Sequence, residues 1–170
     1  MTEAATVVLG VGSPLMGDDG LGVHVVETLR ERWDADPSLV FLDGGTWGMR
    51  ILPHIETAGR LMVLDAIRGG RDPGAVVRLD REDLPRHLRH KLSPHQIDLA
   101  EVLALAELRG TLPDEAVVLG IEPERVVLHH GLSSVVEAAV PALVDAVREQ
   151  LRAWGHDVAE RPESEVARHA

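Results

Sequence analysis

Short apolar runs without any polar alternation are the feature that most constrains the fold of this chain. Four of them lie at residues 7–11, 39–42, 61–64 and 117–121. A strand with one wet face alternates apolar and polar residues, whereas a strand of a parallel sheet is buried on both faces and does not alternate. The four runs therefore predict a central, mostly parallel sheet. A fifth run, at residues 75–79, follows a glycine-containing loop and is expected as an edge strand.

Stretches with helical periodicity lie between these runs. One includes Val25, Leu29 and Trp33, another spans residues 97–108, and a weaker one at 49–58 must hold Pro53 in or near its first turn. The clearest is a continuous apolar stripe formed by Val136, Val140, Leu143, Val147, Leu151 and Trp154. The alternation of strands and helices predicts a doubly wound α/β protein. We expect a three-layer α/β/α sandwich around a mostly parallel twisted sheet of about five strands.

Length and composition narrow the function classes. The chain has 170 residues, so we expect a single domain over residues 1–154, followed by a polar, frayed tail over 155–170. A formal net charge of -11 and only four aromatic residues, one Phe and three Trp, argue against a nucleic-acid partner. Cysteine is absent, which excludes disulfides, thiolate nucleophiles and cysteine-based zinc sites.

The chain also lacks the sequence signals of export or membrane insertion. The first basic residue is Arg30, so no charged region precedes the apolar stretch at residues 7–16. No run reaches the roughly 18 to 20 apolar residues that span a bilayer. We therefore expect a cytoplasmic protein without membrane insertion.

The glycine-rich turn after the first run leads directly into two adjacent carboxylates, Asp18 and Asp19. The glycines suggest a dinucleotide-binding loop, but the third glycine of G-x-G-x-x-G would fall at Leu15, and Pro14 removes an N–H donor. Two acids also repel phosphate. Two carboxylates at this position suit a bound cation or a proton transfer instead. The alternative for each is simple helix capping.

Other chemistry-bearing residues follow the remaining strands, where sites of open α/β sheets form. They are Asp43 with Gly44 and Gly45 after the second run, Asp65 after the third, and His95 in the segment SPHQ before a helix. Carboxylates from two strand ends and one histidine compose a mixed oxygen and nitrogen metal set. Taken singly, Asp65 is equally consistent with a turn residue and His95 with an exposed loop histidine.

The other candidate groups are weaker. Solvated positions are expected for His24, His54, His87 and His90. His129 and His130 precede Ser133 and Ser134, which are expected to cap the last helix. A Ser/His/Asp triad can be assembled from His130 and Ser134, but no G-x-S-x-G nucleophile elbow accompanies it.

Four ordered motifs resemble those of the hydrogenase maturation proteases, which trim the C-terminal extension from the large subunit precursor of nickel-iron hydrogenases. The motifs are GVGSPLMGDDGLGV, LDGGTWGMRILPHI, MVLDAI and KLSPHQIDLAEVL, and the resemblance covers about residues 7–151. It implies a three-layer α/β/α fold. It also implies a metal-binding and catalytic trio at Asp19, Asp65 and His95, and a substrate-facing segment at Gly44, Gly45 and Thr46. Some members carry Glu in place of Asp19, and Ser13 departs from the family's usual Asn.

The same resemblance implies the cofactor and the partner. Nickel is presented by the hydrogenase large subunit precursor, and three protein ligands leave coordination positions open for metal-assisted peptide hydrolysis. Asp18 is expected to cap a helix rather than to act as a base beside the ligands. Two alternatives stay open at this point: a nickel carrier that binds the same precursor without cutting it, and a nucleotide-binding module, which Pro14 and the two acids oppose.

Overall fold

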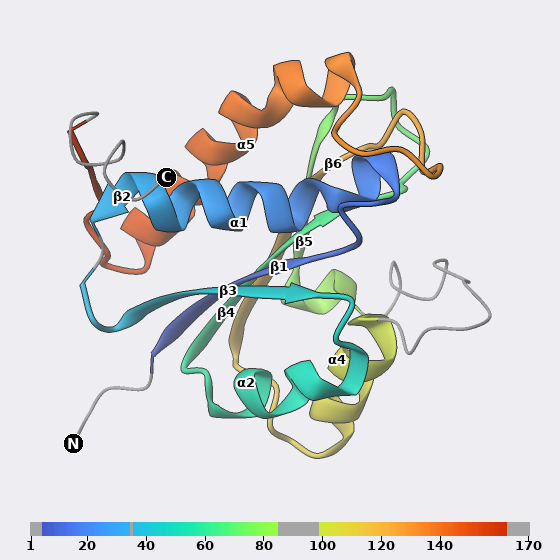
Figure 1. Ribbon diagram of the computed structural model, residues 1–170. Coiled ribbons are helices and arrows are strands. Elements are labelled where there is room, and N and C mark those ends of the chain that lie inside the picture. The colour runs from blue at the N-terminus through green and yellow to red at the C-terminus, as the bar shows by residue number, and fades with distance from the viewer. Residues whose placement is uncertain (1–4, 35, 85–98, 163–170) are drawn as a thin grey trace.

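A five-stranded sheet forms the centre of the molecule (Figure 1). The computed structural model describes residues 5–34, 36–84 and 99–162. In spatial order the strands are β3 (Leu39–Gly45), β1 (Thr6–Val11), β4 (Arg60–Ala66), β6 (Glu115–Ile121) and β5 (Val76–Asp80). The first four pair in parallel, and β5 pairs antiparallel with β6 at the edge. The predicted sheet and its edge strand are confirmed.

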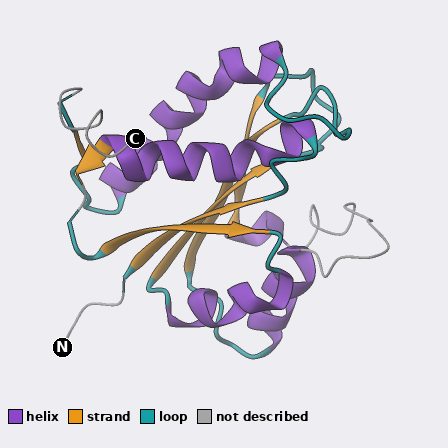
Figure 2. Ribbon diagram, in the orientation of Figure 1, coloured by secondary structure: helices purple, strands orange, loops and turns teal. Residues whose placement is uncertain are grey.

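Helices cover both faces of this sheet, as Figure 2 shows. The helical segments are η1 (Gly17–Gly20), α1 (Leu21–Arg32), η2 (Gly48–Ile51), α2 (Leu52–Thr57), η3 (Arg81–Asp83), α4 (Leu99–Leu108) and α5 (Ser134–Ala153). One face carries α1 and α5, and the other carries α2 and α4. The three-layer α/β/α sandwich is thus confirmed. In the described part of the chain, no helix is both long and apolar enough to cross a membrane.

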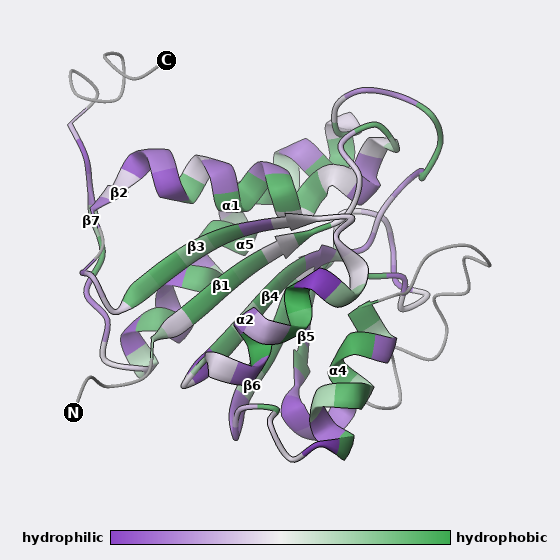
Figure 3. Ribbon diagram, turned by 60° about the horizontal axis from the view of Figure 1, so that its bottom comes forward, coloured by the Kyte–Doolittle hydropathy of each residue, from purple (hydrophilic) through white to green (hydrophobic). Residues whose placement is uncertain are grey.

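The strands are apolar on both faces because each face has its own core. Along β1, Val8 packs toward α1 and α5, whereas Leu9 packs toward α2 and α4. In Figure 3 the central strands are predominantly green, the colour of hydrophobic residues. This two-sided burial explains why the apolar runs do not alternate.

The apolar stripe of the last helix is buried as predicted. Val136, Leu143, Val147 and Leu151 are inaccessible to solvent, and Val140 and Trp154 pack partly buried against the same core. Burial of an aliphatic side chain of this size contributes roughly 1.5 to 3 kcal/mol. Helix α5 is therefore integral to the fold.

Glycines bring α1 unusually close to the sheet. A Cβ atom on Gly22 would lie 2.0 Å from the carbonyl oxygen of Leu64 and 2.5 Å from that of Val11. Only glycine allows this approach, because real Cβ atoms do not come so near to backbone. As a result, the first turn of α1 lies directly against the carboxyl ends of β1 and β4.

The chain remains packed beyond Trp154, so the expectation of a frayed tail from residue 155 was wrong for its first part. His156 and Val158 are buried, and β7 (Ala159–Glu160) pairs antiparallel with β2 (Trp33–Asp34). The prediction rested on the polar composition of this segment, which does not indicate that two of its side chains are buried. Val158 joins the core beside α1 and α5, and His156 makes hydrogen bonds to other side chains.

Candidate active site

The loops at the carboxyl edge of the parallel strands meet around the turn that follows β1. On one side, the Gly12 N–H donates to the carbonyl of Gly45 at the end of β3, at 2.9 Å. On the other side, the loop of residues 122–133 between β6 and α5 lies beside η1 (Figure 1). Sites of open α/β sheets form at this edge.

Asp19 lies half-buried in η1, tightly enclosed by the turn before it. Its Oδ2 accepts a hydrogen bond from the Ser13 N–H at 2.8 Å. Gly12 has a φ of +115°, and a Cβ there would lie 1.8 Å from the Asp19 carbonyl oxygen, so this position needs glycine. Because the backbone of Ser13 makes the bond, the departure from the family's usual Asn does not remove it. The carboxylate is thus held in place by main chain.

Asp65 lies near the end of β4 and is only 3% exposed. In the parallel register the preceding residue, Leu64, is opposite Gly10 of β1, and η1 packs against β4. The structure therefore brings Asp19 and Asp65 to the same edge, from adjacent strands. That these two side chains hold one metal ion stays a prediction.

His95, the third member of the predicted trio, lies outside the described residues, as do His87 and His90. Among the residues that the structure does describe, no group of three or more His, Asp or Glu side chains could hold a metal ion. The proposed ligand set is therefore represented here by its two carboxylates. Their oxygen chemistry suits a divalent cation together with an imidazole nitrogen.

Asp18 is completely buried, and its carboxylate joins η1 to the loop between β6 and α5 through hydrogen bonds. Its Oδ1 accepts a bond from the Ser133 N–H at 2.6 Å. Its Oδ2 accepts bonds from the Ser133 hydroxyl and from the N–H groups of Glu124 and Arg125, each at 2.9 Å. Burial raises the pKa of Asp18, but these hydrogen bonds outweigh it and hold the pKa below the ordinary value of 3.8.

The expectation that Asp18 caps a helix was wrong. The residue before α1 is Gly20, which makes no side-chain cap bond, and the carboxylate of Asp18 turns to the loop before α5 instead. Ser133 does occupy the N-cap position of α5, but its side chain makes no cap bond either. Its hydroxyl donates to Asp18. No local sequence pattern indicates this contact, because Ser133 is 115 residues from Asp18.

A third buried carboxylate holds the loop that follows Asp65. Glu122, only slightly exposed, accepts hydrogen bonds from the N–H groups of Gly69 at 2.7 Å and Arg71 at 3.2 Å. The Ile67 N–H also donates to the carbonyl of Ile121 at 3.0 Å. Sequence reasoning missed Glu122. Its role is to fix the backbone just beyond the candidate ligand.

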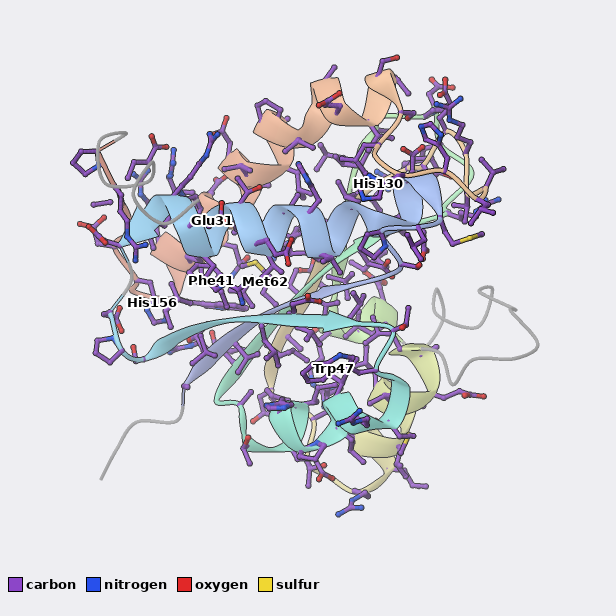
Figure 4. All side chains as sticks on the ribbon, in the orientation of Figure 1. Glu31, Phe41, Trp47, Met62, His130 and His156 are labelled. Carbon is purple, nitrogen blue, oxygen red and sulfur yellow. The ribbon has the colours of Figure 1, made fainter. Side chains whose placement is uncertain are left out.

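The predicted substrate-facing segment lies at the carboxyl end of β3 and on the first residue after it. Gly44 is buried, Gly45 has a φ of +42°, and Thr46 is exposed. The exposed Trp47 follows, near the carboxyl end of β3 in Figure 4, with the Arg50 guanidinium 5.7 Å from its ring centre. Trp47 was missed, although a tryptophan in a chain with so few aromatic residues is a signal. It adds an apolar surface beside the segment.

The fold and these residues are those of an α/β sandwich protein with carboxylates grouped at the carboxyl edge of its parallel strands. Known proteins that resemble the chain identify its family. The family model of hydrogenase maturation proteases matches residues 23–150. The hydrogenase expression/formation protein HoxM of Cupriavidus necator is 38% identical over 151 residues, which cover 88% of this chain and 75% of HoxM.

Two matches from Escherichia coli agree. The hydrogenase 2 maturation protease is 36% identical over 150 residues, covering 88% of this chain and 92% of that protein. The solved structure of the hydrogenase maturating endopeptidase HybD has a TM-score of 0.86 at 35% identity, with 92% of this chain and 98% of that one covered. The chain belongs to the hydrogenase maturation protease family. This membership places it among the hydrolases that act on peptide bonds.

Proposed function

We propose that this protein is a cytoplasmic endopeptidase that removes the C-terminal extension of a nickel-iron hydrogenase large subunit precursor, and that it depends on the nickel of that precursor. The observation that carries the proposal is that Asp19, in η1 after β1, and Asp65, near the end of the adjacent strand β4, lie at one edge of the sheet. Membership of the maturation protease family supplies the reaction class. The names of the relatives supply the link to hydrogenases.

Asp19, Asp65 and His95 are the proposed ligands for the nickel that the substrate presents. Two carboxylates and one imidazole form a donor set that accepts divalent first-row ions, and three ligands leave positions open. When bound there, such an ion polarises the scissile carbonyl or lowers the pKa of a bound water. No cysteine is available as an alternative nucleophile.

The protein's own contribution is to hold these groups still and to position the substrate chain. The Ser13 N–H fixes one oxygen of Asp19, and the bonds that Asp18 accepts fix the turn on which Asp19 lies. Gly44, Gly45 and Thr46 form the proposed binding surface for the extended substrate segment. Catalytic groups held in this way lose little entropy when the substrate arrives.

The deciding experiment incubates the protein with precursor purified with and without nickel and weighs the products by mass spectrometry. We expect the nickel-loaded precursor to shorten and the nickel-free precursor to keep its length. Trimming of nickel-free precursor would overturn the nickel dependence. A loaded precursor that binds but keeps its length would instead identify a nickel carrier.

Substitution of a proposed ligand should abolish cleavage without unfolding the protein. Asp65→Asn keeps the side-chain size but removes the charge, so we expect cleavage to fall by more than about 100-fold, beyond the loss typical of groups that only support a ligand. His95→Gln should behave alike. The matched controls, His87→Gln and His90→Gln, should cut at the normal rate. Undiminished cleavage by both ligand variants would refute the assignment.

A further inference from the structure

Exposed apolar side chains gather beside the candidate active site. In the described part of the chain, six large hydrophobic residues are exposed, and three of them lie on the two loops that meet at η1. These are Leu15, Val127 and Leu128, with exposed fractions of 61%, 49% and 83%. An isolated exposed leucine is ordinary on a protein surface, but a group of them marks a contact site.

The two loops are joined by backbone contacts directly beside these side chains. Met16 and His129 form a parallel bridge. The His129 N–H donates to the Leu15 carbonyl at 3.0 Å, and the Gly17 N–H donates to the His129 carbonyl at 2.7 Å. Leu15 and Leu128 each immediately precede the bridged pair. The bridge therefore brings the two exposed leucines close together, from segments far apart in the sequence.

The loops that carry this surface are fixed rather than mobile tips. Asp18, from the turn that follows Leu15, accepts its four hydrogen bonds from Glu124, Arg125 and Ser133, on either side of Val127 and Leu128. The Asp18 N–H also donates back to the carbonyl of Arg125 at 3.2 Å. A preorganised backbone loses little freedom when a partner binds, so its exposed apolar groups are available for affinity.

We propose that Leu15, Val127 and Leu128 form a docking surface for the folded body of the precursor, through an apolar patch next to its cleaved extension. This inference rests on the proposed function. Leu15 lies in the turn that leads directly into η1, where Asp19 lies, so a molecule that covers Leu15 also lies at the edge where cleavage is proposed. The substrate is the macromolecule that must reach this edge. A second copy of the chain bound there would obstruct it, and the net charge of -11 opposes an anionic membrane.

The test measures binding to nickel-free precursor, which keeps its full length under the proposed function. We expect the double variant Leu15→Ser/Leu128→Ser to bind at least tenfold more weakly than the wild type in biolayer interferometry. The control is Leu108→Ser, because Leu108 is equally exposed, at 84%, but ends α4 at the opposite edge of the sheet. Its affinity should not change. Circular dichroism melting would verify that the variants are folded.

Several outcomes would overturn the docking surface. They are an unchanged affinity of the double variant for the precursor, an equal loss of affinity in Leu108→Ser, and no binding by the wild type. A further one is a wild type that sediments as a dimer while the double variant sediments as a monomer. Cleavage by mass spectrometry is a separate measurement. A protein that binds through this surface but cuts nothing would refute the proposed protease activity and keep the docking site. If the double variant cuts nickel-loaded precursor with the same KM as the wild type, the docking surface is refuted and the proposed protease activity stands.

Discussion

Two buried polar side chains tie distant parts of the chain together at opposite edges of the sheet, and they do so differently. At the carboxyl edge, Asp18 accepts hydrogen bonds from residues more than 100 positions away. At the amino edge, His156 contacts Thr6 Oγ1 at 2.8 Å and Asp36 Oδ2 at 3.1 Å. In Figure 4, His156 lies far from His130, which is on the loop at the carboxyl edge.

The partners of the two groups differ in kind. Three of the four donors to Asp18 are backbone N–H groups, so this carboxylate determines the path of a loop. His156 contacts two side chains, Thr6 in β1 and Asp36 in the loop before β3, so it attaches the tail to segments whose path it does not determine. Both avoid the cost of an unpaired buried polar group. Only the first also sets the geometry of the site.

Replacement of Asp18 should therefore have the largest effect and should affect both stability and activity. Asp18→Ala leaves four donors without their acceptor, and we expect the free energy of unfolding to fall by about 3 to 5 kcal/mol. Cleavage should fall as well, because the turn that carries Asp19 loses its anchor. Urea unfolding and mass spectrometry of the precursor measure the two effects.

A graded series sharpens this prediction. Ser133→Ala removes the hydroxyl donor and keeps the backbone donors, so its cost should be about 1 kcal/mol. Asp18→Asn keeps the size but replaces one accepting oxygen by an NH2 group, which faces N–H donors. Its loss of unfolding free energy should therefore be closer to that of Asp18→Ala than to that of Ser133→Ala. If Asp18→Asn were as stable and as active as the wild type, Asp18 would not position the loops.

Replacement of His156 should reduce stability alone. His156→Ala removes both side-chain contacts and leaves Thr6 without its partner, so we expect a loss of about 1 to 3 kcal/mol. The kcat and KM for precursor cleavage should not change at a temperature where the variant is folded. His24→Ala, at an exposed position of α1, is the matched control and should alter neither. A fall in kcat for His156→Ala would show that the two edges are coupled.

The same contrast explains what could be predicted from the sequence. The strands, the helices and the common edge of Asp19 and Asp65 follow from apolar patterning and from the rule that sites form at carboxyl strand ends. The bonds of Asp18, and the burial of His156 within a polar tail, join residues over 100 positions apart. No local pattern encodes such contacts. Capping was the local explanation for Asp18, and the tertiary contact replaced it.

The smallest expected effect is a pH dependence at the amino edge. Hydrogen bonds from the Ser38 hydroxyl, from His156 and from the Ser38 N–H lower the pKa of Asp36 from 3.8 to about 2. A carboxylate with a lowered pKa contributes stability above its ordinary pKa, and this contribution is lost as the pH falls from about 4 toward 2. Asp36 is exposed, so solvent screening keeps the contribution small.

Comparison of the wild type with Asp36→Asn isolates this contribution. The urea midpoint of the wild type should exceed that of the variant at about pH 6, and the difference should narrow below about pH 4 as the wild-type carboxylate takes up its proton. The variant has no carboxylate at this position and so lacks that transition. A difference that stays constant down to about pH 3 would mean that the bonds from Ser38 and His156 do not favour the charged form. The contacts of His156 would then contribute through packing alone.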